Sequence, residues 1–209
     1  MKATDMKLHW SPKSPYVRKV MVCLYELRLE DRVERVRSVA AMLRPNPQIM
    51  RDNPLSKIPT LVLDDGMALF DSAVICEYLD DLADGGLFPA PGEEKWRTLR
   101  WHAFADGLLD VLILWRNEVD RSDAQRSDAL IEAFRIKTEA SLQRLEGEAR
   151  ELAAAPFGIA HIALGCTLGY LDFRFGALRW RERAPYLAAW YDEVAARPSF
   201  RRTEPVLEG

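Results

Sequence analysis

The chain has 209 residues, enough for one or two compact domains with a sizeable core. Its 29 Lys and Arg against 32 Asp and Glu leave a net charge of -3, and 48% of the residues are apolar. This balance argues against a disordered chain and against a basic surface for nucleic acid or an anionic membrane, so we expect neither as a partner.

The first elements along the chain are short strands alternating with helices. Residues 7–10 are compatible with a strand, and Ser14-Pro15 resembles a helix N-cap with proline at the first helical position. Residues 33–39 form a weaker strand candidate, and residues 47–52 suggest a short helix. A hairpin is predicted for 59–63 and 67–70, followed by a helix that opens at Asp71-Ser72.

The remainder of the chain has helical periodicity. Residues 83–94 hold three glycines and two prolines and form the predicted linker. Long amphipathic helices are expected from 101 to 119 and from 130 to 145, and another apolar stripe covers 187–194. Residues 158–178 are apolar on most sides, which is typical of the central helix of a bundle.

Targeting signals and metal sites are not predicted. The first ten residues include Asp5 and lack the apolar run of a secretory signal, so we expect a cytoplasmic protein. The three cysteines and the three histidines are dispersed and do not have the spacing of metal ligands; they are Cys23, Cys76 and Cys166, and His9, His102 and His161. We therefore expect buried thiols and no metal site.

A first candidate for chemistry is Ser14. As an N-cap, its oxygen accepts from a backbone amide while its proton can be donated to an anion beside the positive end of the helix dipole. A purely structural cap is the alternative for such a residue on its own. Ser11 is a rival hydroxyl, but Ser14 stands directly before the periodic helix.

Lys57-Ile58-Pro59 is the second candidate. A proline that opens a strand lacks one ladder donor, and a cis Ile58–Pro59 bond would leave the main chain of Ile58 facing outward. An extended peptide could pair there by β-augmentation. An ordinary edge-strand proline is the alternative.

Asp71-Ser72 is the third candidate. The amides and hydroxyl at the start of a helix suit a ligand carboxylate, and the Asp71 carboxylate suits an ammonium group. Together they could hold an α-amino acid, although Asp and Ser are also common helix caps.

The order of these motifs resembles the glutathione S-transferase superfamily over almost the whole chain. The motifs are Ser14-Pro15-Tyr16-Val17-Arg18-Lys19-Val20, Asn53-Pro54, Lys57-Ile58-Pro59-Thr60-Leu61, Phe70-Asp71-Ser72 with Ile75 and Tyr78-Leu79, Ile162-Ala163-Leu164-Gly165, Tyr170-Leu171-Asp172-Phe173-Arg174 and Arg197-Pro198-Ser199-Phe200.

The resemblance implies an α/β plus all-α chain, with a thioredoxin-like domain at 1–82, a linker at 83–94 and a helical bundle domain at 95–209. It implies a cytoplasmic homodimer that binds glutathione as co-substrate and transfers it to a small hydrophobic electrophile. In serine-type members Ser14 would stabilise the thiolate, and Ile58 before Pro59 would pair with the cysteinyl unit. Asp71 and Ser72 would hold the γ-glutamyl end, and Lys57 could contact the glycyl carboxylate.

One departure from the family pattern concerns the central helix of the second domain. Members carry a reciprocal cap there, whereas this chain has Gly158 and His161. The loss predicts lower stability, and the double change Gly158→Ser with His161→Asp is expected to raise the melting temperature.

Other reactions and roles stay open at this stage. Glutathione-dependent isomerisation, dehalogenation and peroxide reduction use the same thiolate, and some members are non-catalytic interaction proteins, as the stringent starvation proteins are. Glutaredoxin-like exchange is disfavoured because a serine at position 14 cannot form a mixed disulfide. Trp10, Tyr16 and Trp115 could line the second-substrate site but are more typical of core packing.

Overall fold

The computed structural model describes residues 5–206 and divides the chain into two compact units. The first unit runs up to Pro91 and also contains the segment that starts at Pro198, and the second unit is Gly92–Arg197. Within residues 5–206 no helix combines the length and hydropathy that a bilayer crossing needs.

A four-stranded mixed sheet forms the centre of the first unit. Its strands are β1 (Met6–Trp10), β2 (Val33–Arg37), β3 (Thr60–Leu63) and β4 (Ala68–Leu69), in the order β2-β1-β3-β4. β1 pairs parallel with β2 and antiparallel with β3, and β3 pairs antiparallel with β4. The predicted strands and the predicted hairpin are therefore confirmed.

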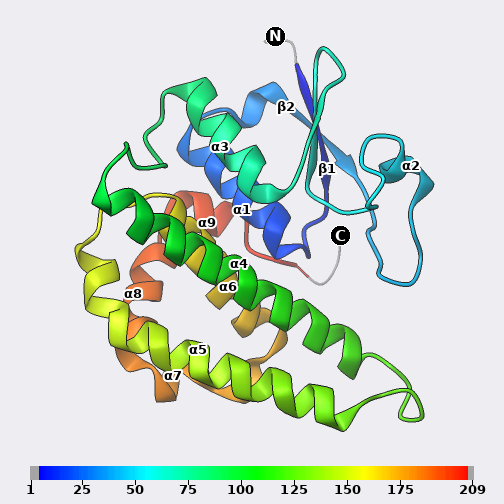
Figure 1. Ribbon diagram of the computed structural model, residues 1–209. Coiled ribbons are helices and arrows are strands. Elements are labelled where there is room, and N and C mark those ends of the chain that lie inside the picture. The colour runs from blue at the N-terminus through cyan, green and yellow to red at the C-terminus, as the bar shows by residue number, and fades with distance from the viewer. Residues whose placement is uncertain (1–4, 207–209) are drawn as a thin grey trace. The chain divides into compact units, whose positions relative to one another are not determined.

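Helices α1 (Pro15–Glu26) and α3 (Ser72–Ala83) pack side by side (Figure 1). Apolar residues of α1 at helical spacing are buried, among them Val17, Val20 and Leu24. The 3₁₀ helix η1 (Glu30–Arg32) leads into β2, and the short helix α2 (Pro47–Met50) follows it. Asn46 caps α2, because its Oδ1 accepts from the Gln48 N–H at 2.9 Å.

The last helix, α9 (Pro198–Arg202), groups with the first unit and packs on α1. The sequence analysis assigned residues 95–209 to the helical domain, so the structure differs at this end. The cause is a set of long-range bonds, in which Arg18 donates to the Phe200 carbonyl at 3.2 Å and Ser199 donates to Glu26 at 2.5 Å.

The second unit consists of helices. They are α4 (Glu93–Val119), α5 (Asp128–Ala154), α6 (Ile159–Arg174), the 3₁₀ helix η2 (Gly176–Leu178), α7 (Trp180–Arg183) and α8 (Pro185–Ala195). Every residue of α6 from Ile159 to Leu171 is buried, and α6 packs against α4 and α8 (Figure 1). The predicted central helix is confirmed, and it ends at Arg174, before η2.

The start of α6 corrects one sequence-based expectation. Gly158 is the N-cap and makes no side-chain cap bond, as expected. His161, however, is buried, its Nε2 hydrogen-bonds the Leu152 carbonyl at 3.0 Å, and its ring packs between Phe157 and Trp190. His161→Asp would remove that packing, so only the Gly158→Ser half of the proposed repair remains favourable.

Candidate functional site

The strand register gathers the three predicted segments at one end of the sheet. His9 pairs with Thr60, so the chain that leaves β1 toward Ser14 lies beside Ile58 and Pro59, which enter β3. Leu61 pairs with Leu69, so the chain that leaves β4 toward Asp71 lies at the same end. The antiparallel order thus places the end of β1, the start of β3 and the end of β4 together.

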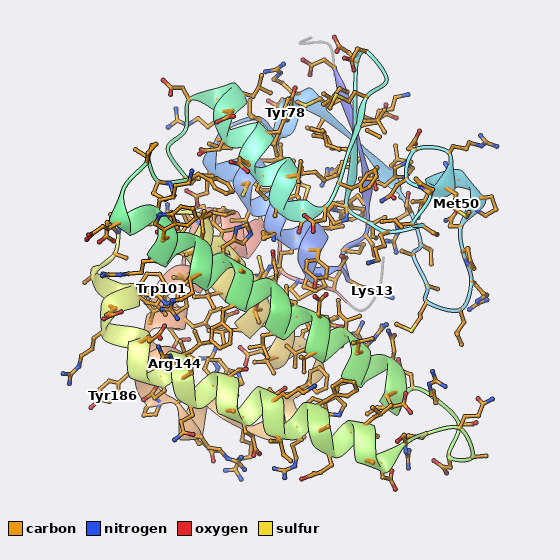
Figure 2. All side chains as sticks on the ribbon, viewed as in Figure 1. Lys13, Met50, Tyr78, Trp101, Arg144 and Tyr186 are labelled. Carbon is orange, nitrogen blue, oxygen red and sulfur yellow. The ribbon has the colours of Figure 1, made fainter. Side chains whose placement is uncertain are left out.

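Ser14 is the N-cap of α1. Its Oγ accepts from the Val17 N–H at 3.3 Å, and the Pro15 ring occupies the first helical position. Since the oxygen is the acceptor in this bond, the hydroxyl proton can point away from the helix toward an anion. The segment lies beside Lys13, which Figure 2 labels in the connection from β1 to α1.

Ser11, the rival hydroxyl, lies on the same side of this connection. Its Oγ accepts from the Lys13 N–H at 3.4 Å, and its carbonyl accepts from the Ser14 N–H at 3.3 Å. Both serines line one cavity of about 220 Å³. The two serines therefore border the same space, and Ser14 is the one that caps the helix.

The Ile58–Pro59 bond is cis. Across residues 5–206 neither the amide nor the carbonyl of Ile58 forms a hydrogen bond, so both are available to an extended ligand. The turn is held from the inside, because the Lys57 carbonyl accepts from the Thr60 hydroxyl at 2.9 Å and from the Asn53 amide at 3.4 Å. The Lys57 side chain is exposed.

Asp71 and Ser72 open α3. Asp71 follows a cis peptide bond with Phe70, and its Oδ1 accepts from the Ala73 N–H at 3.0 Å. Ser72 is buried, and its hydroxyl has no hydrogen-bond partner within residues 5–206. The hydroxyl and the amides of the first turn have the chemistry to bind a carboxylate, and the Asp71 carboxylate has the chemistry to bind an ammonium group.

The three aromatic residues considered for the second-substrate wall have different surroundings. Trp10 lines the 220 Å³ cavity together with the two serines. Trp115 is buried in the second unit, where its ring lies 4.8 Å from that of Phe175, so it packs in the core. The Tyr16 ring lies under the Lys19 ammonium in α1.

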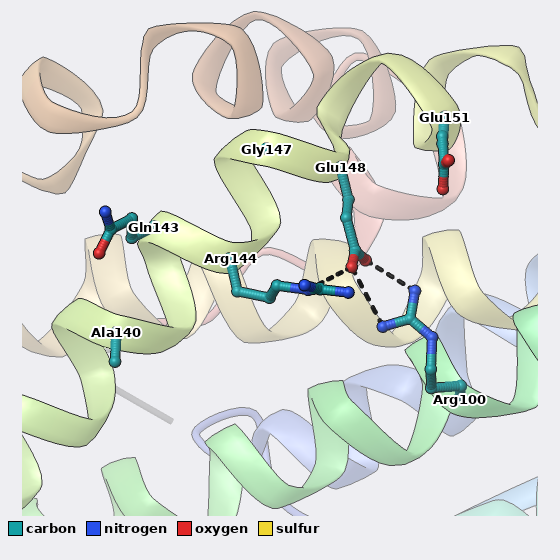
Figure 3. Close-up of a pocket in the computed structure, with 7 residues that line it drawn as sticks. All are labelled: Arg100, Ala140, Gln143, Arg144, Gly147, Glu148 and Glu151. Atoms are coloured by element: carbon teal, nitrogen blue, oxygen red, sulfur yellow. Dashed lines mark hydrogen bonds and ion pairs between the residues drawn. The ribbon is translucent and has the colours of Figure 1, made fainter.

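A second, larger groove of about 640 Å³ lies on α4 and α5 (Figure 3). The Glu148 carboxylate lies in this groove. It accepts hydrogen bonds from Arg100 Nη1 and Nη2 at 3.2 and 2.8 Å and forms an ion pair with Arg144 Nε at 2.5 Å. Burial raises the pKa of Glu148, but the bonds from Arg100 and Trp101 outweigh it and hold the pKa below its ordinary value. The charges satisfy one another, which is typical of a structural ion-pair cluster.

The sequence analysis did not identify a group of hydrogen-bonded polar side chains around His9 in the first unit. His9 Nε2 hydrogen-bonds Asp52 at 2.7 Å, and its Nδ1 hydrogen-bonds Ser38 at 2.8 Å. His9 alternates with the buried Leu8 along β1, so its side chain lies on the opposite face of the sheet, toward the segment that follows α2. The period of β1 was the available signal, but nothing local identifies partners 29 and 43 residues away.

The described residues contain no cluster of three or more His, Cys, Asp or Glu that could hold a metal ion. The cysteines at 23, 76 and 166 are buried thiols.

Comparisons with known proteins agree with this architecture. The glutathione S-transferase N-terminal domain model matches residues 13–82 and the C-terminal domain model matches residues 128–193. The Escherichia coli K12 protein named "Uncharacterized GST-like protein YibF" is 33% identical over 203 residues, covering 96% of this chain and 98% of that protein.

Two solved structures of a glutathione transferase family member from Pseudomonas fluorescens Pf-5 are also similar. One, with bound glutathione, has a TM-score of 0.93 and 43% identity, and covers 97% of this chain and 100% of that one. The other, with bound S-(propanoic acid)-glutathione, has a TM-score of 0.89 and 42% identity over 96% and 100% of the two chains. The chain belongs to the glutathione S-transferase family.

Proposed function

We propose that this chain binds glutathione at the end of the sheet, ionises its thiol and transfers the sulfur to a small electrophile. The observation that carries the proposal is the unpaired main chain of Ile58 between two helix starts, those of Ser14 and Asp71. A cysteinyl residue that pairs with Ile58 would have its side chain toward one helix start and its amino-terminal neighbour toward the other. Family membership and the glutathione-bound relative support the same ligand.

The tripeptide would be held mainly by backbone and helix-terminal groups. The Ile58 amide and carbonyl would pair with the cysteinyl unit, with Pro59 fixing the turn. Asp71 would bind the γ-glutamyl ammonium, and Ser72 with the first amides of α3 would bind its carboxylate. Lys57, which is exposed, would contact the glycyl carboxylate.

Ser14 would keep the sulfur ionised. A thiol of pKa ~8.5 must lose ~2 pKa units to be mostly thiolate at neutral pH, which requires ~3 kcal/mol. A hydrogen bond to a charged acceptor contributes ~1.5 to 3 kcal/mol, and the N-terminus of α1 contributes ~0.3 to 1 kcal/mol. The hydroxyl and the helix together meet the requirement without a histidine base.

The reaction proposed is conjugation. The thiolate attacks an electrophilic carbon, a sulfur–carbon bond forms, and the leaving group departs with its electron pair. Isomerisation and dehalogenation would start from the same thiolate. We further propose that the protein acts as a homodimer in the cytoplasm, as the family resemblance implies.

Retention on immobilised glutathione, followed by turnover of a chlorodinitrobenzene-type electrophile, tests this function. We expect retention and turnover in the unaltered protein. Ser72→Ala should weaken glutathione binding, because the buried hydroxyl is lost from the carboxylate site. Ser141→Ala is the matched control, since that hydroxyl bonds the Lys137 carbonyl within α5 of the second unit.

The outcomes separate two kinds of protein. Retention without turnover of a panel of electrophiles would indicate a non-catalytic interaction protein. Failure to bind glutathione at all would refute the proposal.

A further inference from the structure

The cavity beside Ser14 combines apolar and aromatic side chains with three arginines. Apolar and aromatic side chains line it, among them Trp10, Val17 and Met21. Its charged residues are three arginines and one carboxylate, namely Arg18, Arg35, Arg202 and Glu204. All of these residues belong to the first unit.

Arg18 is the strongest feature of this cavity. It is one turn after Ser14 on α1 and is only 7% exposed. Its Nη2 donates to the Phe200 carbonyl at 3.2 Å and its Nε to the Thr203 hydroxyl at 3.5 Å. Both acceptors are neutral, and within residues 5–206 Arg18 forms no ion pair. A buried charge without a counter-ion is costly, which favours an anion as the missing partner.

Each of the other two guanidiniums lies near an aromatic ring. Arg35 lies 5.7 Å from the centre of the Trp10 ring, and Arg202 lies 5.5 Å from that of Tyr25. Neither forms an ion pair among the described residues, and the cavity's exposed Glu204 pairs with none of the three. Both side chains are exposed, and their contacts with the rings place the two charges beside the cavity.

The sheet order separates this cavity from the tripeptide segments. β2, which carries Arg35, lies on one side of β1, and β3 and β4, which lead from Ile58 and to Asp71, lie on the other. Ser14 follows β1, so it stands between the two. A sulfur held at Ser14 would therefore have the tripeptide on the β3 side and its new substituent on the β2 side.

We infer that this cavity binds a carboxylate on the electrophile, so that the preferred co-substrates are short-chain electrophilic acids. The inference rests on the proposed function, because it places the sulfur at Ser14. Ser14 and Arg18 lie one turn apart at the start of α1 and line the same cavity, so a short-chain acid carried on the sulfur would enter a space that Arg18 lines. In a halo acid of this kind the thiolate displaces the halide, which leaves with its electron pair, and the carboxylate is unchanged.

The test compares two conjugates that differ only in charge, S-(2-carboxyethyl)glutathione and its isosteric amide S-(2-carbamoylethyl)glutathione, by titration calorimetry. We expect the unaltered protein to bind the acid about tenfold or more tightly than the amide, as a charge-assisted hydrogen bond implies. The double variant Arg35→Gln with Arg202→Gln should reduce this ratio several-fold, and Arg18→Gln should abolish it.

The control is Arg201→Gln, because Arg201 is an exposed arginine of the same helix as Arg202 and does not line the cavity. Arg18→Gln could unfold the protein because it joins α1 to α9, and the double variant at exposed positions tests the inference without that risk. Equal affinity for the two conjugates, or an equal loss in Arg201→Gln, overturns the inference and leaves the proposed function standing. If neither conjugate binds, the proposed function itself fails.

Discussion

The hydroxyl of Ser14 is proposed to hold the glutathione sulfur as a thiolate, and its removal gives the most direct test. Ser14→Ala deletes a donor to the sulfur and leaves α1 and its dipole in place. A donor to a charged acceptor contributes ~1.5 to 3 kcal/mol, so the pKa of the bound thiol should rise by ~1 to 2 units from about 6.5.

The rate should follow the thiolate population. At a pH of about 6.5 the ionised fraction, and with it turnover, should fall about 5- to 50-fold in Ser14→Ala. Above a pH of ~9 the two proteins should converge, because both thiols are then ionised. Ultraviolet titration of the thiolate of bound glutathione gives the midpoint, and the pH profile of turnover gives the kinetic counterpart.

Loss of the cap complicates this variant, and the chain offers a matched control. Ser14 accepts from Val17 at 3.3 Å, so its removal also costs ~0.5 to 1 kcal/mol of stability. Ser127 caps α5 through an identical 3.3 Å bond from Leu130, in the second unit. Ser127→Ala should show a similar stability loss with an unchanged thiol midpoint. An unchanged midpoint in Ser14→Ala refutes the assignment, and a shift in Ser11→Ala instead transfers the role to Ser11.

Three further predictions concern the second unit. Glu148→Gln removes the negative charge that faces Arg100 but keeps an acceptor oxygen, and because Arg100 is half exposed to water we expect a loss of only about 1 kcal/mol in urea unfolding. Gly158→Ser should raise the melting temperature slightly, by up to ~1 kcal/mol of stability, whereas His161→Asp should lower it. Burial lowers the pKa of His161, and the Arg197 charge lowers it further. The unfolded chain therefore binds more protons than the folded one, and the melting temperature should fall as the pH drops below ~6.5. His161→Gln should make the melting temperature less dependent on pH in this range.

The parts of the site that sequence analysis located are those encoded by local rules. Ser14-Pro15 and Asp71-Ser72 are helix starts, and both begin a helix in the structure. Pro59 marks a strand start for a similar reason, since a missing donor restricts where proline can stand. Turn and cap chemistry act over a few residues, so one sequence is enough to detect them.

Contacts across long separations were out of reach of the same rules. The family resemblance implies that His161 stands where members carry a capping acid, but its contacts in the structure are with the Leu152 carbonyl and with the rings of Phe157 and Trp190. Likewise, the assignment of α9 to the helical domain followed from the family resemblance and from the order of the elements along the chain. Tertiary packing decides both, because neither partner set follows from the period of a single helix.

The wall of the cavity next to Ser14 illustrates how a local signal can still point to a distant partner. Arg18 follows the buried Val17 and precedes the buried Met21 by three positions, so it shares a helix face with residues of the core. Sequence reasoning places an arginine in solvent by default. Here the Phe200 carbonyl, 182 residues away, accepts from its guanidinium, so the charge is buried beside the proposed thiolate position without a counter-ion among the described residues. We therefore expect the burial of this arginine, one turn after a capping hydroxyl, to favour an anionic ligand at this helix start.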